Sequence, residues 1–261
     1  MKQLLIIFMM TMSAATAQTK KVLFVMSAAK ELPLKNGKTY TQTGVFLSEF
    51  YLAYKAIADA GYSIEIATPQ GIASSIDNES YKAKYWKGQE VLIGEAKTFV
   101  TTNPNFLHPH TPEYALQHSN EYAGMVIPGG QGLMVDLIHD KTILQIISKM
   151  AEDKKAVGLI CHAPALLTSY TKADNPFKGY TVNCITGFEE FYIERFVMKG
   201  KPYKRKIARS LKKLGFSYKK GGPGSSFAVK DRQLVTSQNP YSNNKFNALY
   251  LQALEEYANK P

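Results

Sequence analysis

Short apolar runs alternate with amphipathic segments along most of the chain. Residues 22–26 and 156–160 are consecutive apolar positions with no polar alternation, which is typical of parallel strands that are covered on both faces. Residues 44–60 place apolar side chains at helical spacing, and the segment stops at Gly61. This alternation predicts a three-layer α/β/α sandwich built on a flavodoxin-like, mostly parallel sheet.

The same pattern predicts the remaining elements. A strand at 63–67 would close a right-handed βαβ unit with the first strand. The segment 69–120 is aromatic and irregular, and so long an insertion is usually a cap over a site. Further strands are expected at 123–128 and 182–185, a hairpin at 227–236 around Asp231, and helices at 136–151, 162–170, 202–214 and 243–257.

The N-terminus carries a candidate targeting signal. Lys2 is followed by the apolar run 4–12 and then by Ala15-Thr16-Ala17, a small-x-small pattern that indicates a secretory signal peptide over residues 1–17. The run is shorter than the ~20 residues that span a bilayer. We therefore expect cleavage after Ala17, a periplasmic or secreted location, and a single mature α/β domain over 18–261.

The formal charge of +11 is concentrated in one segment, because ten Lys or Arg lie between Lys199 and Lys220. A cluster of this kind can bind acidic partners. Ile207, Leu211 and Leu214 keep one apolar stripe, however, so a solvated helix face is the favoured interpretation. We expect no nucleic-acid partner and, once the signal is removed, no membrane association.

Cysteine is scarce, and Cys161 stands where a buried strand runs directly into a helix. Such a strand-turn-helix elbow exposes the nucleophile in α/β hydrolytic folds, and the helix dipole would favour a thiolate. A buried structural thiol is the alternative. A disulfide with Cys184 is the second alternative in an oxidising compartment, although the two positions would need Cα atoms within ~7 Å.

Two other stretches are candidates for binding. Gly129-Gly130-Gln131-Gly132 follows a predicted strand, where free backbone N–H groups can point at an anion. His108-Pro109-His110 with Glu113 has a weak metal-ligand spacing, but a proline-containing surface loop is favoured. No metal or other cofactor is expected.

Five motifs in one order resemble the PfpI-like superfamily of class I glutamine amidotransferase-like proteins. The match is most similar to its chaperone and glyoxalase III branch, the relatives of the small yeast heat-shock chaperone, and it extends from Val22 to the last helix. The motifs are Thr43–Glu49, Ile127–Gly132, Ile160–Pro164, Ile185–Phe188 and Leu234–Pro240.

The resemblance implies a catalytic set. Cys161 would be the nucleophile, His162 its neighbour, and Glu49 the carboxylate beside the sulfur. Backbone N–H groups of the Gly129-Gly130 pair and of His162 would bind an oxyanion. Glu49 lies within an apolar helix, where an unpaired charge is costly, and this agrees with a buried role.

The chain also departs from the resemblance. Gln131 stands where the branch usually has a histidine after the two glycines, so substrate preference is open. Ala163 replaces a frequent glycine. The acid that would orient His162 is not evident from the sequence, and the candidates are Glu189, Glu190 and Glu194.

The leading functional prediction is a lyase of the glyoxalase III, or D-lactate dehydratase, type. It would convert methylglyoxal-like α-oxoaldehydes through a Cys161 hemithioacetal, with Glu49 transferring the proton and without glutathione. A cysteine hydrolase that acts as a deglycase or peptidase is one alternative. A holding chaperone for unfolded clients in the stress response, or a redox sensor, is the other. The amidotransferase reaction is disfavoured because no His-x-Glu pair lies near the C-terminus. The sequence leaves a homodimer open.

Overall fold

A six-stranded sheet forms the centre of the protein in the computed structural model, which describes residues 21–259. Its strand order is β4-β1-β5-β6-β10-β9. The first five strands are parallel, and β9 pairs antiparallel with β10. The predicted signal peptide lies outside the described residues. The strands are β1 Lys21–Val25, β4 Ser63–Ala67, β5 Gly124–Ile127, β6 Ala156–Ile160, β9 Ala228–Asp231 and β10 Leu234–Ser237.

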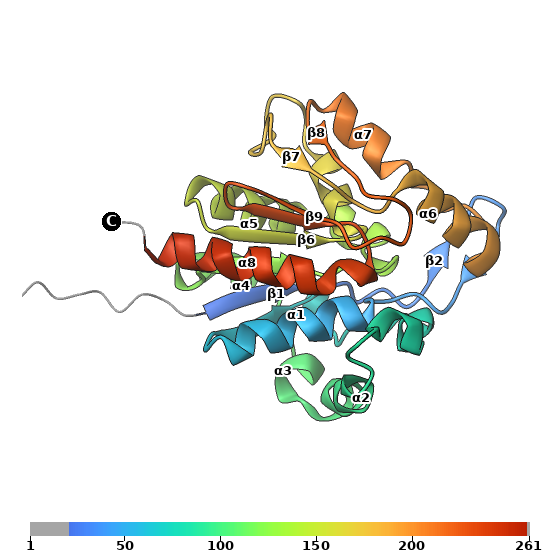
Figure 1. Ribbon diagram of the computed structural model, residues 1–261, viewed down its shortest axis with the longest axis horizontal. Helices are drawn as coiled ribbons and strands as arrows, with labels where there is room; N and C mark the ends of the chain where they lie inside the picture. The colour runs from blue at the N-terminus through green and yellow to red at the C-terminus, as the bar shows by residue number, and fades with distance from the viewer. Residues whose placement is uncertain (1–20, 260–261) are drawn as a thin grey trace, which may run out of the picture.

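Helices cover both faces of this sheet. Helices α1 (Leu47–Asp59) and α8 (Asn243–Ala258) pack side by side on one face, and α5 (Lys141–Glu152) packs against β6 on the other (Figure 1). Strands β5 and β6 are buried along their whole length, as expected for parallel strands between two helical layers. The predicted three-layer sandwich is therefore confirmed.

The carboxyl ends of the parallel strands define the edge at which the candidate site lies. Strands β1, β5 and β6 run in register as neighbours, so the loops that follow them emerge at the same edge of the sheet. The loop after β5 carries Gly129 and Gly130, and the loop after β6 carries Cys161 and His162. The pairing of β5 with β6 therefore brings the two glycines close to Cys161 and His162, although about 30 residues separate the two loops in sequence.

Several element boundaries differ from the sequence prediction. Helix α1 begins at Leu47 rather than Gly44, because Val45 exchanges backbone hydrogen bonds with Ser75 and Asp77 (2.9 and 3.0 Å). The expected helix at 136–151 is interrupted at Asp140, whose side chain caps α5. The strand expected at 182–185 is reduced to β7 (Thr181–Val182), which pairs outside the main sheet with β8 (Ser217–Tyr218).

The other helices are short. The helix expected at 202–214 is α7 (Ile207–Lys213), and the helix after Cys161 is a 3₁₀ helix, Ala163–Ser169. Helix α6 (Gly187–Tyr192) continues into a π-helical turn, Ile193–Val197. A small hairpin is formed by β2 (Leu32–Pro33) and β3 (Thr39–Tyr40).

The segment predicted to be a cap, residues 69–120, folds into several short helices. They include α2 (Leu92–Thr102), α3 (Pro104–Leu107) and α4 (Pro112–Gln117). The His110 ring stacks on Tyr114 with centroids 3.9 Å apart. Within residues 21–259, no group of three or more acidic, histidine or cysteine side chains is arranged to hold a metal ion. No helix in this range is long and apolar enough to cross a membrane.

Candidate active site

Cys161 occupies a tight elbow between β6 and the 3₁₀ helix. Its φ of +58° lies in the left-handed region, which residues other than glycine rarely adopt. The elbow is held by two backbone hydrogen bonds, because Cys161 N–H donates to Ser237 (2.8 Å) and Ile185 N–H donates to the Cys161 carbonyl (2.9 Å). Strain of this kind is stored where a side chain must be aimed at a site. Both Cys161 and Cys184 are buried free thiols, so the disulfide alternative does not apply to this structure.

Glu49 is a fully buried carboxyl in the first turn of α1. Its Oε2 accepts the Gly129 N–H at 3.0 Å, whereas Oε1 forms no regular hydrogen bond with any described residue. Burial raises the pKa of Glu49 to about 8, and the nearby Cys161 thiol and the Gly129 N–H oppose that rise only in part. Glu49 is therefore mostly protonated at neutral pH.

Gly129 is the point at which the carboxyl and the cysteine meet. A Cβ atom added to Gly129 would collide with Glu49 Oε2 and would lie 2.7 Å from the Cys161 Cβ. Burial, followed by the charges of Glu49 and Glu189, raises the pKa of the Cys161 thiol. These effects oppose the thiolate that the helix dipole was expected to favour, so the resting site is better described as a thiol beside a carboxylic acid.

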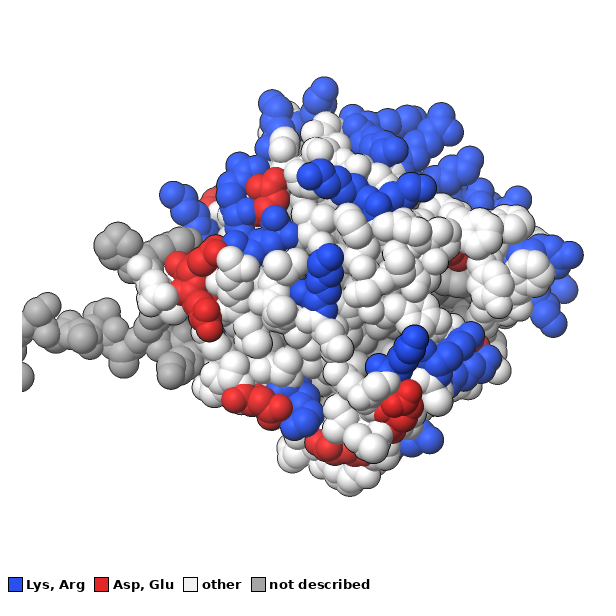
Figure 2. Space-filling view, in the orientation of Figure 1, with Lys and Arg blue, Asp and Glu red and all other residues white. Residues whose placement is uncertain are grey.

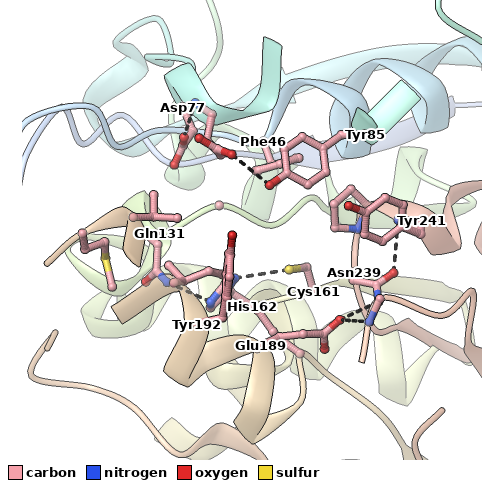
Figure 3. Close-up of a pocket in the computed structure, with 18 of the residues that line it drawn as sticks. Phe46, Asp77, Tyr85, Gln131, Cys161, His162, Glu189, Tyr192, Asn239 and Tyr241 are labelled. Carbon is pink, nitrogen blue, oxygen red and sulfur yellow. Dashed lines mark hydrogen bonds between the residues drawn. The ribbon is translucent and has the colours of Figure 1, made fainter. Parts of the chain in front are cut away.

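His162 contacts the sulfur through one ring nitrogen and Gln131 through the other. Nδ1 lies 3.3 Å from Cys161 Sγ, and Nε2 lies 2.9 Å from the Gln131 side-chain nitrogen (Figure 3). With the Gln131 amide in this orientation its nitrogen donates to Nε2, which assigns the ring proton to Nδ1, where it faces the sulfur. Burial lowers the pKa of His162 to about 4. The ring is thus a neutral N–H donor to sulfur at neutral pH.

The three acids considered as orienting groups for His162 are engaged elsewhere. The Glu189 carboxylate accepts from Thr186 and from Asn239. Glu190 accepts from the Lys206 N–H, and Glu194 pairs with Arg205. Among the described residues the ring Nε2 is held by Gln131 instead. The sequence singled out Gln131 as a departure, but its contact with His162 became visible only in three dimensions.

Two backbone N–H groups are free to bind developing negative charge. The Gly129 N–H is already donated to Glu49, so it is not one of them. Gly130, at φ +111°, and His162 donate no backbone hydrogen bond to a described residue. Both residues also line the cavity that contains Cys161, so their N–H groups are the candidate donors for an oxyanion.

The cavity over Cys161 has a volume of about 340 Å³ and an acidic, aromatic wall. Asp77, Glu79 and Glu189 contribute carboxyl groups, whereas Lys84 is its one basic residue and pairs with Glu79 at 3.1 Å. Burial raises the pKa of Asp77 to about 7. Asp77 and Glu79 could not be predicted from the sequence, because 69–120 has no periodic pattern. Aromatic side chains on the wall are Tyr40, Phe46, Tyr85, Phe188, Tyr192 and Tyr241.

Comparison with known proteins shows the family to which the chain belongs. The family model described as "DJ-1/PfpI family" matches residues 40–253. The chain belongs to the DJ-1/PfpI family. It is 24% identical over 235 residues to the Escherichia coli protein named protein/nucleic acid deglycase HchA, covering 90% of this chain and 81% of that protein.

Solved structures place this DJ-1/PfpI protein in the same fold. The crystal structure of glyoxalase III from Candida albicans superposes with a TM-score of 0.71 at 25% identity, covering 90% of this chain and 98% of that one. Drosophila melanogaster DJ-1beta superposes with a TM-score of 0.53 at 15% identity over 92% of this chain and 96% of that one, a likeness of fold alone.

Proposed function

We propose that this DJ-1/PfpI protein is a glutathione-independent enzyme of the glyoxalase III type, which converts methylglyoxal-like α-oxoaldehydes into D-lactate or its analogues. The observation that carries the proposal is Glu49, a buried and largely protonated carboxyl beside the Cys161 thiol. A carboxyl with a pKa near the working pH can both take and return a proton in each turnover.

The first step is addition of the thiol to the aldehyde. Cys161 Sγ forms a bond to the aldehyde carbon while the ionised fraction of Glu49 accepts the thiol proton. That proton then passes to the carbonyl oxygen, which gives a hemithioacetal. The His162 Nδ1–H stabilises charge on sulfur during the attack, and the backbone N–H groups of Gly130 and His162 stabilise charge on oxygen.

The second stage moves hydrogen between the two carbons. Glu49 removes the hydrogen of the former aldehyde carbon as a proton to give an enediolate, and the hydroxyl proton on that carbon passes to the neighbouring oxygen. Glu49 then returns its proton to the adjacent carbon. This produces a thioester on Cys161. Water hydrolyses the thioester, releasing the 2-hydroxy acid and restoring the thiol. One oxoaldehyde and one water yield one 2-hydroxy acid, so the reaction balances without an external oxidant or reductant.

Formation of D-lactate from methylglyoxal tests the proposal. We expect turnover by the wild type and by Cys184→Ala, because the Cys184 thiol does not line the cavity. Cys161→Ala should lose activity by at least about a thousandfold, since no nucleophile remains. Equal turnover by Cys161→Ala and Cys184→Ala would refute the proposal.

Hydrolysis of glycated adducts is a second candidate, favoured by the size and charge of the cavity. A volume of about 340 Å³ is larger than a three-carbon oxoaldehyde requires. The wall carboxyls of Glu189 and ionised Asp77 would suit a cationic amine or guanidinium leaving group, whereas Glu79 is already paired with Lys84. The E. coli relative is named a deglycase. Lactate released from a preformed methylglyoxal–arginine adduct faster than the adduct dissociates would favour this reaction, whereas release at the rate of dissociation would favour the lyase.

A further inference from the structure

A row of aromatic side chains is exposed beside the mouth of the cavity. Helix α6 continues without a break into the π-helical turn 193–197. Phe188, Phe191 and Phe196 are 60%, 53% and 57% exposed, and Tyr192 is 46% exposed. These positions are three, four and eight residues after Phe188, so they lie on one side of a helix. We refer to these four residues as the aromatic ridge.

Basic residues border the aromatic ridge. Arg195, Lys199 and Lys201 are exposed, and together with Phe191 they line a surface hollow of about 450 Å³. The acid in this hollow, Glu194, is buried and pairs with Arg205. Because Glu194 is already paired with Arg205, it does not neutralise the other three cations that line the hollow. We call Arg195, Lys199 and Lys201 the basic rim.

The hairpin β2–β3 extends the basic rim. Lys35 N–H donates to the Lys201 carbonyl at 2.9 Å, and the Asn36 side chain donates to the Lys199 carbonyl at 3.3 Å. These bonds place Lys35 and Lys38, both exposed, beside the rim. Figure 1 shows β2 next to α6, and Figure 2 shows basic side chains beside uncharged surface along the same edge of the molecule.

The charge and shape of this surface indicate which kind of partner it binds. A second copy of the chain, docked symmetrically, would bring two basic rims together and repel. Single-stranded nucleic acid is bound in basic grooves where successive bases stack on several aromatic platforms, whereas the basic hollow here contains a single ring, that of Phe191. The ridge belongs to a helix at the edge of the molecule (Figure 1). A helix with aromatic residues on one side and Lys or Arg beside them is typical of proteins that bind anionic membrane surfaces.

We propose that the aromatic ridge and the basic rim dock this protein onto an anionic phospholipid bilayer. The rings enter the boundary between headgroups and acyl chains, and the hollow between Arg195, Lys199 and Lys201 takes a headgroup phosphate. Phe188 and Tyr192 also line the catalytic cavity, so docking turns the cavity mouth toward the membrane. The proposal differs from the membrane-free state expected from the sequence and does not depend on the reaction catalysed.

Co-sedimentation with lipid vesicles tests this surface. The chain from Gln18 on, without the predicted signal peptide, is mixed with vesicles of phosphatidylcholine with or without phosphatidylglycerol. Two variants remove the surface: Phe191→Ser with Phe196→Ser, and Arg195→Glu with Lys199→Glu and Lys201→Glu. None of these residues lines the catalytic cavity, so unchanged turnover of methylglyoxal, or an unchanged melting temperature if the enzyme proposal fails, shows that the variants fold.

Two control variants carry substitutions of the same kinds at exposed positions outside the ridge and the rim. Ile72→Ser with Val91→Ser removes exposed apolar side chains far from the ridge in sequence, and Lys87→Glu with Lys141→Glu and Lys178→Glu reverses three exposed charges.

We expect the wild type and both controls to bind anionic vesicles and not neutral ones. Binding should weaken with added salt and by at least about tenfold in each surface variant. No binding of the wild type to anionic vesicles, or equal binding by the surface variants and their controls, would overturn the proposal. Two further results would also overturn the proposal. One is a wild-type dimer that dissociates in the variant Phe191→Ser with Phe196→Ser, and the other is binding of oligonucleotides without binding of vesicles.

Discussion

Burial acts in opposite directions on the two titratable partners of Cys161. It raises the pKa of Glu49 to about 8 and lowers that of His162 to about 4, because the charged form of each is the one that loses hydration. Both groups are therefore mainly neutral at neutral pH. The site holds transferable protons next to sulfur without placing a net charge in the interior.

Replacing Glu49 by glutamine should stabilise the fold while abolishing activity. Folding favours protonated Glu49, so the stability it contributes is complete below its unfolded pKa near 4.5 and is lost as the pH rises toward about 8. At pH 7 we expect Glu49→Gln to gain about 2–3 kcal/mol in the free energy of unfolding. Urea denaturation measures this gain.

The matched control is Glu152→Gln, an exposed acid at the end of α5, which should change stability by less than about 0.5 kcal/mol. A loss of stability in Glu49→Gln at pH 7, with no change in the control, would show that the carboxylate is the form the fold prefers.

Gln131 decides which ring nitrogen of His162 carries the proton. Glutamate at this position would accept from Nε2, move the ring proton away from sulfur, and raise the pKa of His162 by supplying a negative charge. Nitrogen-15 NMR of the ring should report Nδ1–H in the wild type and Nε2–H in Gln131→Glu. We expect methylglyoxal turnover to fall by about tenfold, since the sulfur loses a donor. The same tautomer in both proteins would contradict this role.

At the scale of elements, the site depends on the close approach of three segments: the end of β5, the elbow after β6 and the first turn of α1. Gly129 lies where they meet, and an added Cβ has no space there. Gly129→Ala should cost about 1–3 kcal/mol in unfolding free energy and reduce turnover, because Glu49 and Cys161 would be pushed apart.

The control for this substitution is Gly187→Ala, since a Cβ at Gly187 has no atom within 4 Å. Thermal unfolding should leave that variant near the wild type. Equal melting temperatures for Gly129→Ala and the wild type would show that the segments are looser than the structure indicates.

The main strands of the sheet could be located along the chain from the sequence, because buried parallel strands are unbroken runs of apolar residues. The boundaries around Val45 and Asp140 could not, because they are set by backbone pairing with Ser75 and by a side-chain cap. Cys161 could be identified as an elbow residue from its position after a strand. The contact between Gln131 and His162 joins two different loops, so it could not be predicted from the periodicity of either segment.

Across the whole molecule, charge and catalytic chemistry are segregated. The chain carries a net charge of +11, yet the cavity wall has three carboxyl groups and a single lysine. The excess of Lys and Arg lies on the exterior, notably over 199–220 and beside the aromatic ridge. The sequence favours a solvated helix face for this basic segment because Ile207, Leu211 and Leu214 form one apolar stripe. The aromatic ridge that adjoins it belongs to a separate helix.

The proposed mechanism depends on Glu49 acting as the base for Cys161, and this role can be measured through the pH dependence of kcat/KM for D-lactate formation. This quantity reports the ionisation of the free enzyme. Because Glu49 must be ionised to accept the thiol proton, kcat/KM should rise about tenfold per pH unit below pH 8 and level off above it. A profile that is flat from about pH 6 to 9, or that levels off near pH 5, would show that Glu49 is not the base.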